Sequence, residues 1–244
     1  MASAMDILLL RLDAPLMSFG GVMVDQHGPI ERFPGLSMLT GLLGNALGLR
    51  HGDASALEAL QDRVEYAARW DIEPEEIIDY HTVDLGQAKL SEAGWTTRGE
   101  PEHRGGGPSA SLGTHQRFRH YWANGVMTLA ISLGSGEPSA AAFAERLRFP
   151  ARPLFLGRKT CLPSSPLLLG VVSAPDVLSA LMEAPAATRP SRPPTARMSA
   201  CWPLRLGEAG PSRRVPVYDR RDWRNQVHAG RRQRCEGWLE IGAR

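Results

Sequence analysis

The spacing of apolar and polar side chains divides the chain into short strands and helices. Residues 6–13 (DILLLRLD) are apolar almost throughout and are soon followed by Pro15, which is typical of a buried strand. Residues 36–49 carry apolar side chains at helical spacing, contain no charge and follow Pro34, so we expect a buried helix there. The chain therefore begins with a strand and a helix that both belong to the interior.

Three glycines, Gly41, Gly44 and Gly48, recur along this helix at spacings of three and four residues. A glycine in a helix interior costs about 0.5–1 kcal/mol relative to alanine. That cost is tolerable where another backbone packs closely, so we expect such packing against this helix.

The same reasoning places further elements along the rest of the chain. A second, short helix is expected after Asp53, which is a good N-cap residue. The expected elements are helices at 54–63, 138–147 and 176–182, strands at 64–70, 77–83, 126–133 and 167–172 (the last one buried), and strands near 202–206, 214–218 and 238–241.

Up to residue 174 the order of the longer elements is strand, helix, strand, strand, helix, strand. This is the order of the split βαβ, ferredoxin-like arrangement of α+β proteins, and RRM-type proteins of this architecture read single-stranded RNA on a sheet face. We expect residues 1–174 to form this domain, with a glycine- and serine-rich insertion at about 84–117. Residues 175–244 are expected to form a small, arginine-rich and β-rich C-terminal region.

Composition narrows the class of protein. With 43% hydrophobic and 22% charged residues, the chain is of the globular class. Its apolar runs are too short to cross a bilayer, and its first residues lack the basic region of a signal peptide. Its three cysteines are widely spaced and form no CxxC pair, which argues against a disulfide framework or a zinc site. We therefore expect a soluble, cytoplasmic protein without a membrane partner.

The net charge of +2 hides an asymmetry along the chain. Residues 189–234 contain twelve arginines and no lysine, against the three acids Glu208, Asp219 and Asp222. A basic block on an otherwise acidic chain is typical of contact with a polyanion. A bias of the genome toward arginine codons explains the choice of arginine over lysine but not the clustering. If these arginines hold phosphate, neutralising Arg231, Arg232 and Arg234 should flatten the salt dependence of RNA binding.

Catalytic motifs are weak throughout. The seven histidines form no HExxH, CxxCH or nucleophile-elbow pattern, and the glycines at 105–107 lack the Lys-Ser/Thr of a phosphate loop. Tyr80 and His81 suit acid–base cleavage of RNA, but strand alternation places them on opposite faces. A histidine in a strand is more often a hydrogen-bonded packing residue. We therefore expect a non-catalytic chain with no cofactor and no metal.

Three segments carry residues suited to holding RNA. Residues 116–121 (QRFRHY) alternate basic and aromatic side chains, which suits phosphate contact and base stacking at about 1–3 kcal/mol per base, but equally an edge strand with snorkelling arginines. Residues 156–161 (LGRKTC) place two cations in a turn, and the helix start at Ser37 offers free backbone N–H groups to an anion. The candidate RNA-binding residues are Ser37, Tyr80, His81, Gln116, Arg117, Arg119, His120, Tyr121, Arg158 and Lys159.

Taken together, several segments resemble the CasD family of subunits of the type I-E CRISPR Cascade complex, which belongs to the RAMP superfamily. Their order and spacing agree over nearly the whole chain, and several motifs together are far more specific than any one of them. The matching segments are LLLRLDAPLMSFG (8–20), RFPGLSMLTGLLGNALGL (32–49), DYHTV (79–83), RHYWANG (119–125) and PLFLGRKTCLPSSPLLLG (153–170).

The resemblance implies an RNA-binding subunit that holds the 5′ handle of the crRNA in an antiviral ribonucleoprotein. It implies that the inserted segment is a thumb that reaches over the guide and the backbone subunit CasC. The large subunit CasA is a further implied partner, and target DNA is reached only through the complex. Arg119 and Tyr121 match an R-x-Y motif of the family, and Arg158 and Cys161 match a GR-x-x-C motif. The resemblance therefore moves the expected guide contacts away from the arginine-rich tail.

One alternative from a different class stays open. A related subunit of type I-C systems processes precursor crRNA as a metal-independent endoribonuclease. In that case Tyr80, His81 or His120 would carry acid–base work, and Lys159 would stabilise developing charge.

Overall fold

The computed structural model describes residues 4–21, 23, 26–84, 94–95, 101–102, 114–191 and 197–240. They divide into two compact units. The first unit comprises residues 1–20, 30–77 and 121–244, and the second comprises residues 21–29 and 78–120. Most of the expected insertion at 84–117 lies outside the described residues, apart from the short strands β6 (Gly94–Trp95) and β7 (Pro101–Glu102) and the start of β8.

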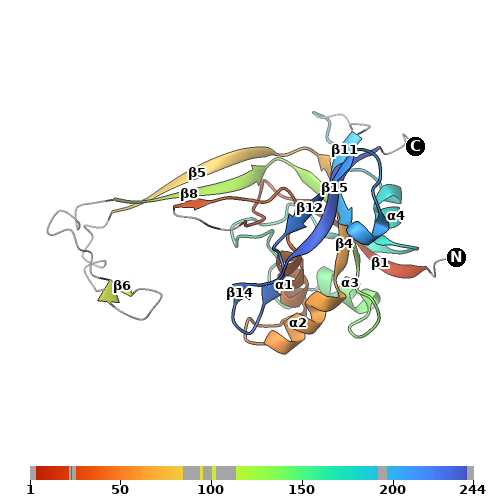
Figure 1. Cartoon of the computed structure of the whole chain (residues 1–244), viewed down its shortest axis with the longest axis horizontal. Helices are drawn as coiled ribbons and strands as arrows, with labels where there is room; N and C mark the ends of the chain where they lie inside the picture. The colour runs from red at the N-terminus through yellow and green to blue at the C-terminus, as the bar shows by residue number, and fades with distance from the viewer. Residues whose placement is uncertain are drawn as a thin grey trace. The chain divides into compact units, whose positions relative to one another are not determined.

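The first unit is built on an antiparallel sheet of seven described strands. Its last three strands lie beside one another in Figure 1 and come from residues 197–240. The last strand in chain order, β15, lies between two others and is not at an edge. From one edge to the other the strands are β10 (Leu168–Ala174), β1 (Met5–Asp13), β9 (Val126–Ser132), β4 (Glu65–Ile72), β11 (Arg197–Pro203), β15 (Arg232–Glu240) and β12 (Ser212–Val217).

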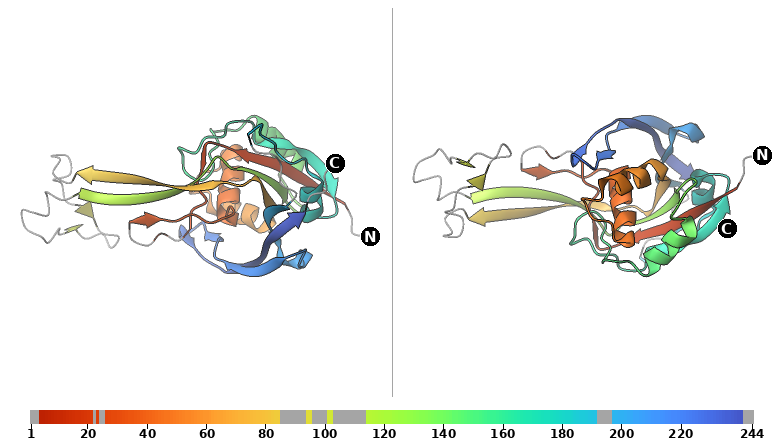
Figure 2. Two further views of the ribbon diagram at one scale, coloured as in Figure 1. Left: turned by 90° about the horizontal axis from the view of Figure 1, so that it is seen from above. Right: turned by 90° about the horizontal axis from the view of Figure 1, so that it is seen from below.

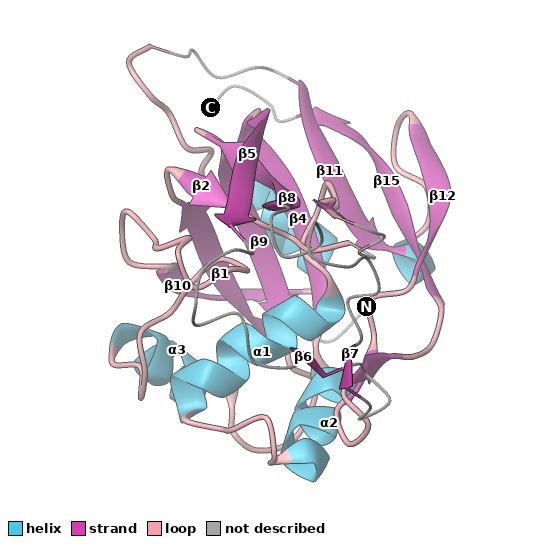
Figure 3. Cartoon of the chain, turned by 90° about the vertical axis from the view of Figure 1, so that its left-hand side faces the viewer, coloured by secondary structure: helices cyan, strands magenta, loops and turns pink. Residues whose placement is uncertain are grey.

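The central strands are buried on both faces, which explains why β1 is apolar at nearly every position and does not alternate. Leu8 and Leu10 pack into one hydrophobic cluster, whereas Ile7 and Leu9 pack into another on the opposite face. The first cluster lies beneath three helices, which Figure 3 shows grouped together. These helices are α1 (Leu36–Leu47), α2 (Ala54–Arg63) and α3 (Ala140–Arg148).

The second face is covered by the helix α4 (Val177–Glu183) and the residues after it. Fully buried Arg69 on β4 donates to the carbonyls of Leu181 and Ala184 and pairs with Asp71 at 2.7 Å between Nε and Oδ1. The other carboxylate oxygen of Asp71 accepts from the backbone N–H of Ala187 at 2.8 Å. This face of the sheet is therefore covered by α4 and the residues that follow it.

Most predicted elements are confirmed to within a few residues, and three of the predicted strands need correction. The strand near 202–206 lies earlier, as β11, and is followed by a 3₁₀ turn (Leu204–Leu206). The strand near 238–241 begins at residue 232, because its polar residues pair with β11 and β12. The strand β10 is not buried: it is an edge strand in which Leu169 and Val171 are exposed. Asp53 occupies the N-cap position of α2, but its carboxylate accepts from the N–H of Arg50 instead.

The glycines of α1 contact side chains and not a neighbouring backbone, contrary to expectation. A Cβ on Gly44 would lie 2.8 Å from Cδ2 of Leu57 on α2, so the missing side chain allows the two helices to approach. Gly41 faces the ring of Trp223, and Gly48 ends the helix with a φ of +89°.

The expected domain boundary at residue 174 does not coincide with the division into compact units. The strand β11 pairs with β4, which joins residues 197–240 to the same sheet as the N-terminal strands. The boundary between the units instead falls within the long strands β5 (Glu75–Asp84) and β8 (Thr114–Ala123). These two strands pair and lie side by side in both views of Figure 2.

Candidate nucleic-acid interface

The predicted cationic turn at residues 156–161 is anchored to the rest of the first unit by its backbone. Ser18 donates its N–H to the carbonyl of Leu156 at 3.0 Å, and within the turn Cys161 donates to the carbonyl of Arg158 at 2.9 Å. Gly157 has a φ of +97°, and a Cβ there would lie 1.7 Å from the carbonyl oxygen of Ser18. Only glycine fits this position, and the close approach fixes where the next two residues stand.

The turn holds Arg158 against an aromatic ring. The guanidinium carbon of Arg158 lies 4.6 Å from the ring centroid of Tyr121, and Lys159 beside it is exposed. Two residues that the family motifs match, Arg158 and Tyr121, are thus brought together. Tyr121 itself is only 4% exposed, so its ring offers little surface for stacking a base. Its ring instead supports the guanidinium by a cation–π contact.

Cys161 closes the turn and has a structural part in it. Its side chain is 1% exposed, and burial raises the pKa of its thiol. A buried thiol with a raised pKa is a poor nucleophile. The GR-x-x-C motif therefore combines one cation held against an aromatic ring with one small residue that packs inward.

The N–H groups of Leu36 and Ser37 at the start of α1 are not free, contrary to the prediction at Ser37. The N–H of Leu36 donates to Oδ2 of Asp219 at 2.9 Å, and the N–H of Ser37 donates to the carbonyl of the same residue at 2.9 Å. The guanidinium of Arg232 binds both carboxylate oxygens of Asp219, at 2.7 and 2.6 Å. Burial alone would raise the pKa of Asp219, but the hydrogen bond and charge of Arg232 outweigh it, and the pKa is lowered. The carboxylate and carbonyl of Asp219, which belongs to the same chain, therefore already accept from the N-terminus of α1.

The arginine-rich tail is largely paired within the protein. Arg234 is 3% exposed, pairs with Glu236 at 2.6 Å and donates to the hydroxyl of Tyr66 at 3.2 Å. Burial, the largest cause, raises the pKa of Tyr66 to about 12, so this hydroxyl stays protonated. Arg232 and Arg234 are therefore already paired with carboxylates of the chain, whereas Arg231 is exposed. Further tail pairs are Arg189–Asp13, Arg205–Glu65, Arg213–Glu236, Arg214–Glu208 and Arg220–Asp62.

The second unit presents a face of aromatic rings. His27 on β3 (His27–Gly28) stacks on Phe118 of β8, with ring centroids 4.7 Å apart and planes inclined by 10°. Tyr80 on β5 lies 5.1 Å from the same Phe118 ring and is 51% exposed. His27 and Phe118 were not among the predicted residues. The alternation of QRFRHY is the signal for Phe118, but nothing in the sequence indicated the parallel pairing that brings His27 beside it.

The exposure of the other predicted residues of β8 does not follow the strand alternation. Gln116 and Arg119 are exposed, whereas Arg117 and His120 are half-buried. The strand pairs with β2 (Leu16–Met17), β3 and β5, so the alternative of an edge strand is wrong. Gln116, Arg117 and Arg119 therefore lie on a strand that pairs with three other strands.

The imidazole of His81 lies beside a carboxylate on its own strand. Its Nε2 lies 2.6 Å from Oδ2 of Asp79, two residues away and thus on the same strand face. Tyr80 lies on the opposite face, so the two residues do not form one acid–base pair. Lys159 belongs to the first unit, and the residues of the alternative catalytic set are not gathered within one compact unit.

Among the residues that the structure describes, no three histidine, cysteine or acidic side chains gather in a way that could hold a metal ion. The described helices are also too short or too polar for any of them to span a bilayer.

Comparison with known proteins gives one consistent result. Residues 7–235 match the family described as CRISPR-associated protein (Cas_Cas5). The Escherichia coli (strain K12) protein "CRISPR system Cascade subunit CasD" is 32% identical over 184 residues, which cover 72% of this chain and 75% of that protein. A chain of a solved "CRISPR RNA-guided surveillance complex" is 24% identical with a TM-score of 0.64, covering 96% of this chain and 90% of that one. A "Crystal structure of Cas protein" has the same TM-score at 22% identity, covering 96% and 95%, and both therefore share the fold.

Proposed function

The chain belongs to the CRISPR-associated Cas5 family, and on that premise we propose that it is a non-catalytic subunit of a type I-E Cascade complex that grips the 5′ handle of the crRNA. In this role it caps the backbone of the complex next to CasC and contacts CasA. Target DNA meets it only through the assembled complex.

The observation that carries the proposal is the anchored turn at residues 156–161. Arg158 and Lys159 are adjacent cations on a turn whose position is fixed by Gly157 and Ser18. A cation held in place loses less conformational entropy when it binds a phosphate than one on a free side chain. The Tyr121 ring fixes the plane of the Arg158 guanidinium, which suits bidentate contact with phosphate oxygens.

The proposal extends to the architecture. The strand order β10-β1-β9-β4, with α1 and α3 as the connecting helices, agrees with a ferredoxin-like unit. The long pair β5 and β8 would then form the base of the thumb. Its aromatic face of His27, Tyr80 and Phe118 suits stacking of bases from a single strand.

A binding experiment with the full chain tests the proposal. The probe is a fluorescently labelled single-stranded RNA that carries the repeat-derived 5′ handle, and the readout is polarisation. We expect Arg158→Gln and Lys159→Gln each to weaken binding about tenfold, the typical value of one charge-assisted contact. Arg224→Gln, which removes an exposed arginine from the tail, is the matched control and should bind as the wild type does. Equal affinities for all four proteins would contradict the proposal.

The endoribonuclease alternative has one observation in its favour, the His81–Asp79 pair at 2.6 Å. A carboxylate beside an imidazole can fix the orientation of its ring for acid–base chemistry. Incubation of the same full chain with complete repeat RNA and a metal chelator decides between the two functions. Site-specific cleavage that disappears in His81→Ala would establish the nuclease, whereas tight binding with intact RNA agrees with the binding subunit.

A further inference from the structure

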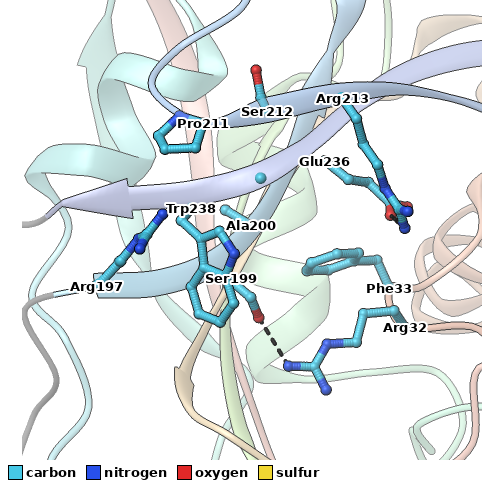
Figure 4. A pocket seen from close by; sticks show the side chains of 11 residues that line it. Arg32, Phe33, Arg197, Ser199, Ala200, Pro211, Ser212, Arg213, Glu236 and Trp238 are labelled. Atoms are coloured by element: carbon cyan, nitrogen blue, oxygen red, sulfur yellow. Dashed lines mark hydrogen bonds and ion pairs between the residues drawn. The ribbon is translucent and has the colours of Figure 1, made fainter.

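A pocket of about 490 Å³ opens in the first unit between residues 32–33 and the strands β11, β15 and β12 (Figure 4). The alternation of side chains along the strands places several of the lining residues on the same face of the sheet. On β15, Cys235 and Leu239 point into the core beneath α4, so Glu236 and Trp238 face the other way. The register then places Ser199 of β11 opposite Trp238.

The pocket is the right size for a small ligand and has an aromatic wall. Its volume lies within the range of about 300–1,000 Å³ that is usual for ligand pockets. Figure 4 shows Trp238 on one side and Phe33 on the other. Trp238 is 41% exposed although it lies on an interior strand, whereas Phe33 is buried. Part of the indole is therefore open to whatever enters the pocket.

The charges that line the pocket favour an anion. Three guanidinium groups, those of Arg32, Arg197 and Arg213, line the pocket together with one carboxylate, that of Glu236. Glu236 pairs with Arg234 at 2.6 Å and lies 3.5 Å from Arg213. Arg32 in turn forms an ion pair with Glu73 beside the pocket. Four guanidinium groups thus stand against two carboxylates, and a positive surplus remains at the pocket.

The polar floor is held in place before any ligand arrives. Arg32 donates to the hydroxyl of Ser199 at 2.9 Å, and that hydroxyl donates to Glu73 at 2.7 Å. The guanidinium of Arg32 also lies 5.4 Å from the ring centroids of both Trp70 and Trp122. These contacts leave Arg32 little freedom, so the pocket is pre-organised.

We propose that this pocket receives one extruded nucleotide of a single-stranded RNA, with its base against Trp238 and its phosphate near Arg197 and Arg213. An aromatic face beside planar guanidinium groups matches the two halves of a nucleotide, a ring and an anion. The guanidinium carbon of Arg197 lies 5.4 Å from the Trp238 centroid, so cation and ring are presented together. The inference rests on the proposed function for the identity of the ligand, and it adds a site separate from the turn at residues 156–161.

The test uses the full chain, the handle RNA described above and two pairs of matched variants. Trp238→Ala should weaken RNA binding about tenfold, because loss of one base stack has that size. Its control is Tyr218→Ala, which removes an aromatic ring that is 61% exposed and outside the pocket. Arg197→Gln should weaken binding to a similar extent, whereas Arg224→Gln should not. Trp238→Phe, which keeps an aromatic face, should bind nearly as the wild type does.

The outcomes separate the two proposals. If the wild type does not bind the RNA, the proposed function fails and this inference fails with it. If the wild type binds and Trp238→Ala binds equally well, the pocket inference is overturned while the proposed function stands. Equal losses in Trp238→Ala and Trp238→Phe would overturn stacking as the cause. Ultraviolet cross-linking should join the RNA to the peptide that contains Trp238, and displacement by an acidic peptide without displacement by adenosine monophosphate would reassign the pocket to a protein partner.

Discussion

Gly157 illustrates how a residue without a side chain positions two residues that have long ones. Its φ of +97° and its approach to the Ser18 carbonyl allow the chain to turn sharply between Leu156 and Arg158. The turn then depends on hydrogen bonds of the backbone and not on the cations themselves. Loss of Gly157 should therefore affect both stability and RNA affinity.

We expect Gly157→Ala to lower the free energy of unfolding by about 1–3 kcal/mol, because a Cβ forces the turn away from Ser18. Denaturant unfolding followed by circular dichroism measures the change. Gly170→Ala is the matched control, because a Cβ at that position on β10 meets no atom within 4 Å. Equal stability of both variants would mean that the turn adapts without cost.

For single residues, the sequence predicts which chemical groups are present better than it predicts whether those groups are exposed to solvent. The adjacent cations Arg158 and Lys159 and the flanking glycine were evident from GRKTC, and the turn is confirmed. Whether Tyr121 faces solvent depends on what packs over it, and the 4% exposure of its ring arises from residues far away in sequence. The same holds for His27, which reaches Phe118 only through a pairing of two segments about ninety residues apart.

At the scale of the element, the start of α1 shows that a helix N-terminus can be satisfied from within the chain. Asp219 lies more than 180 residues from Leu36 and accepts its N–H. Gly35 stands at the N-cap, and its absent side chain leaves room for Asp219, whose Cβ would be 3.0 Å away from a Cβ there. The local sequence PGLS contains no acid, so it gave no indication of this cap.

This contact predicts a specific acid sensitivity. The folded pKa of Asp219 lies below its ordinary value of 3.8, so its contribution is complete above that value and is lost as pH falls through the folded pKa. We expect the melting temperature of the wild type to fall on acidification below about pH 4, and that of Asp219→Asn to fall less steeply. Near neutral pH the variant should be less stable by about 1–3 kcal/mol, because Arg232 loses its partner.

The control for this measurement is Glu183→Gln, which neutralises an exposed carboxylate on α4. It should keep the acid profile of the wild type. Parallel profiles of Asp219→Asn and the wild type below pH 4 would mean that other carboxylates carry the acid response.

The periodicity of the sequence predicts that the helix α4 exists but not where it packs. Its existence was predicted, but its position over the sheet depends on Arg69, a charged residue in the middle of a strand that is otherwise buried. Arg69 is tolerated there because its guanidinium meets the carbonyls of Leu181 and Ala184 and the carboxylate of Asp71. A polar residue in a buried strand was the available signal, and its partners more than a hundred residues away could not be identified from spacing.

For the molecule as a whole, the number of charges in one segment of the chain does not predict the net charge of the surface that this segment forms. The tail arginines pair with acids from distant elements, including Glu65 on β4 and Asp62 on α2. Such pairing cannot be seen in a local count, because it depends on which strands become neighbours. The basic block therefore predicts less about RNA than the short turn at residues 156–161.

We expect this difference to appear in the salt dependence of RNA binding. Arg205→Gln and Arg220→Gln should leave the slope of log K against log salt unchanged, because each arginine is already matched by an acid. Arg158→Gln should reduce the slope by about 0.7, the value for one phosphate contact with a single strand. Polarisation titrations between low and moderate salt measure both, and a reduced slope in the tail variants would restore the tail as an RNA surface.

The interior position of β15 has a consequence for how the protein is made. This strand is the last described strand in chain order, yet β12 has no other described strand partner in the sheet and β11 is bordered by β15 on one side. Until β15 has paired, β12 therefore lacks its neighbour and β11 has an open edge, beside apolar side chains meant for the interior. Pairings between strands separated in sequence also form slowly. The partly folded chain should therefore be prone to aggregation and depend on chaperones until β15 is in place.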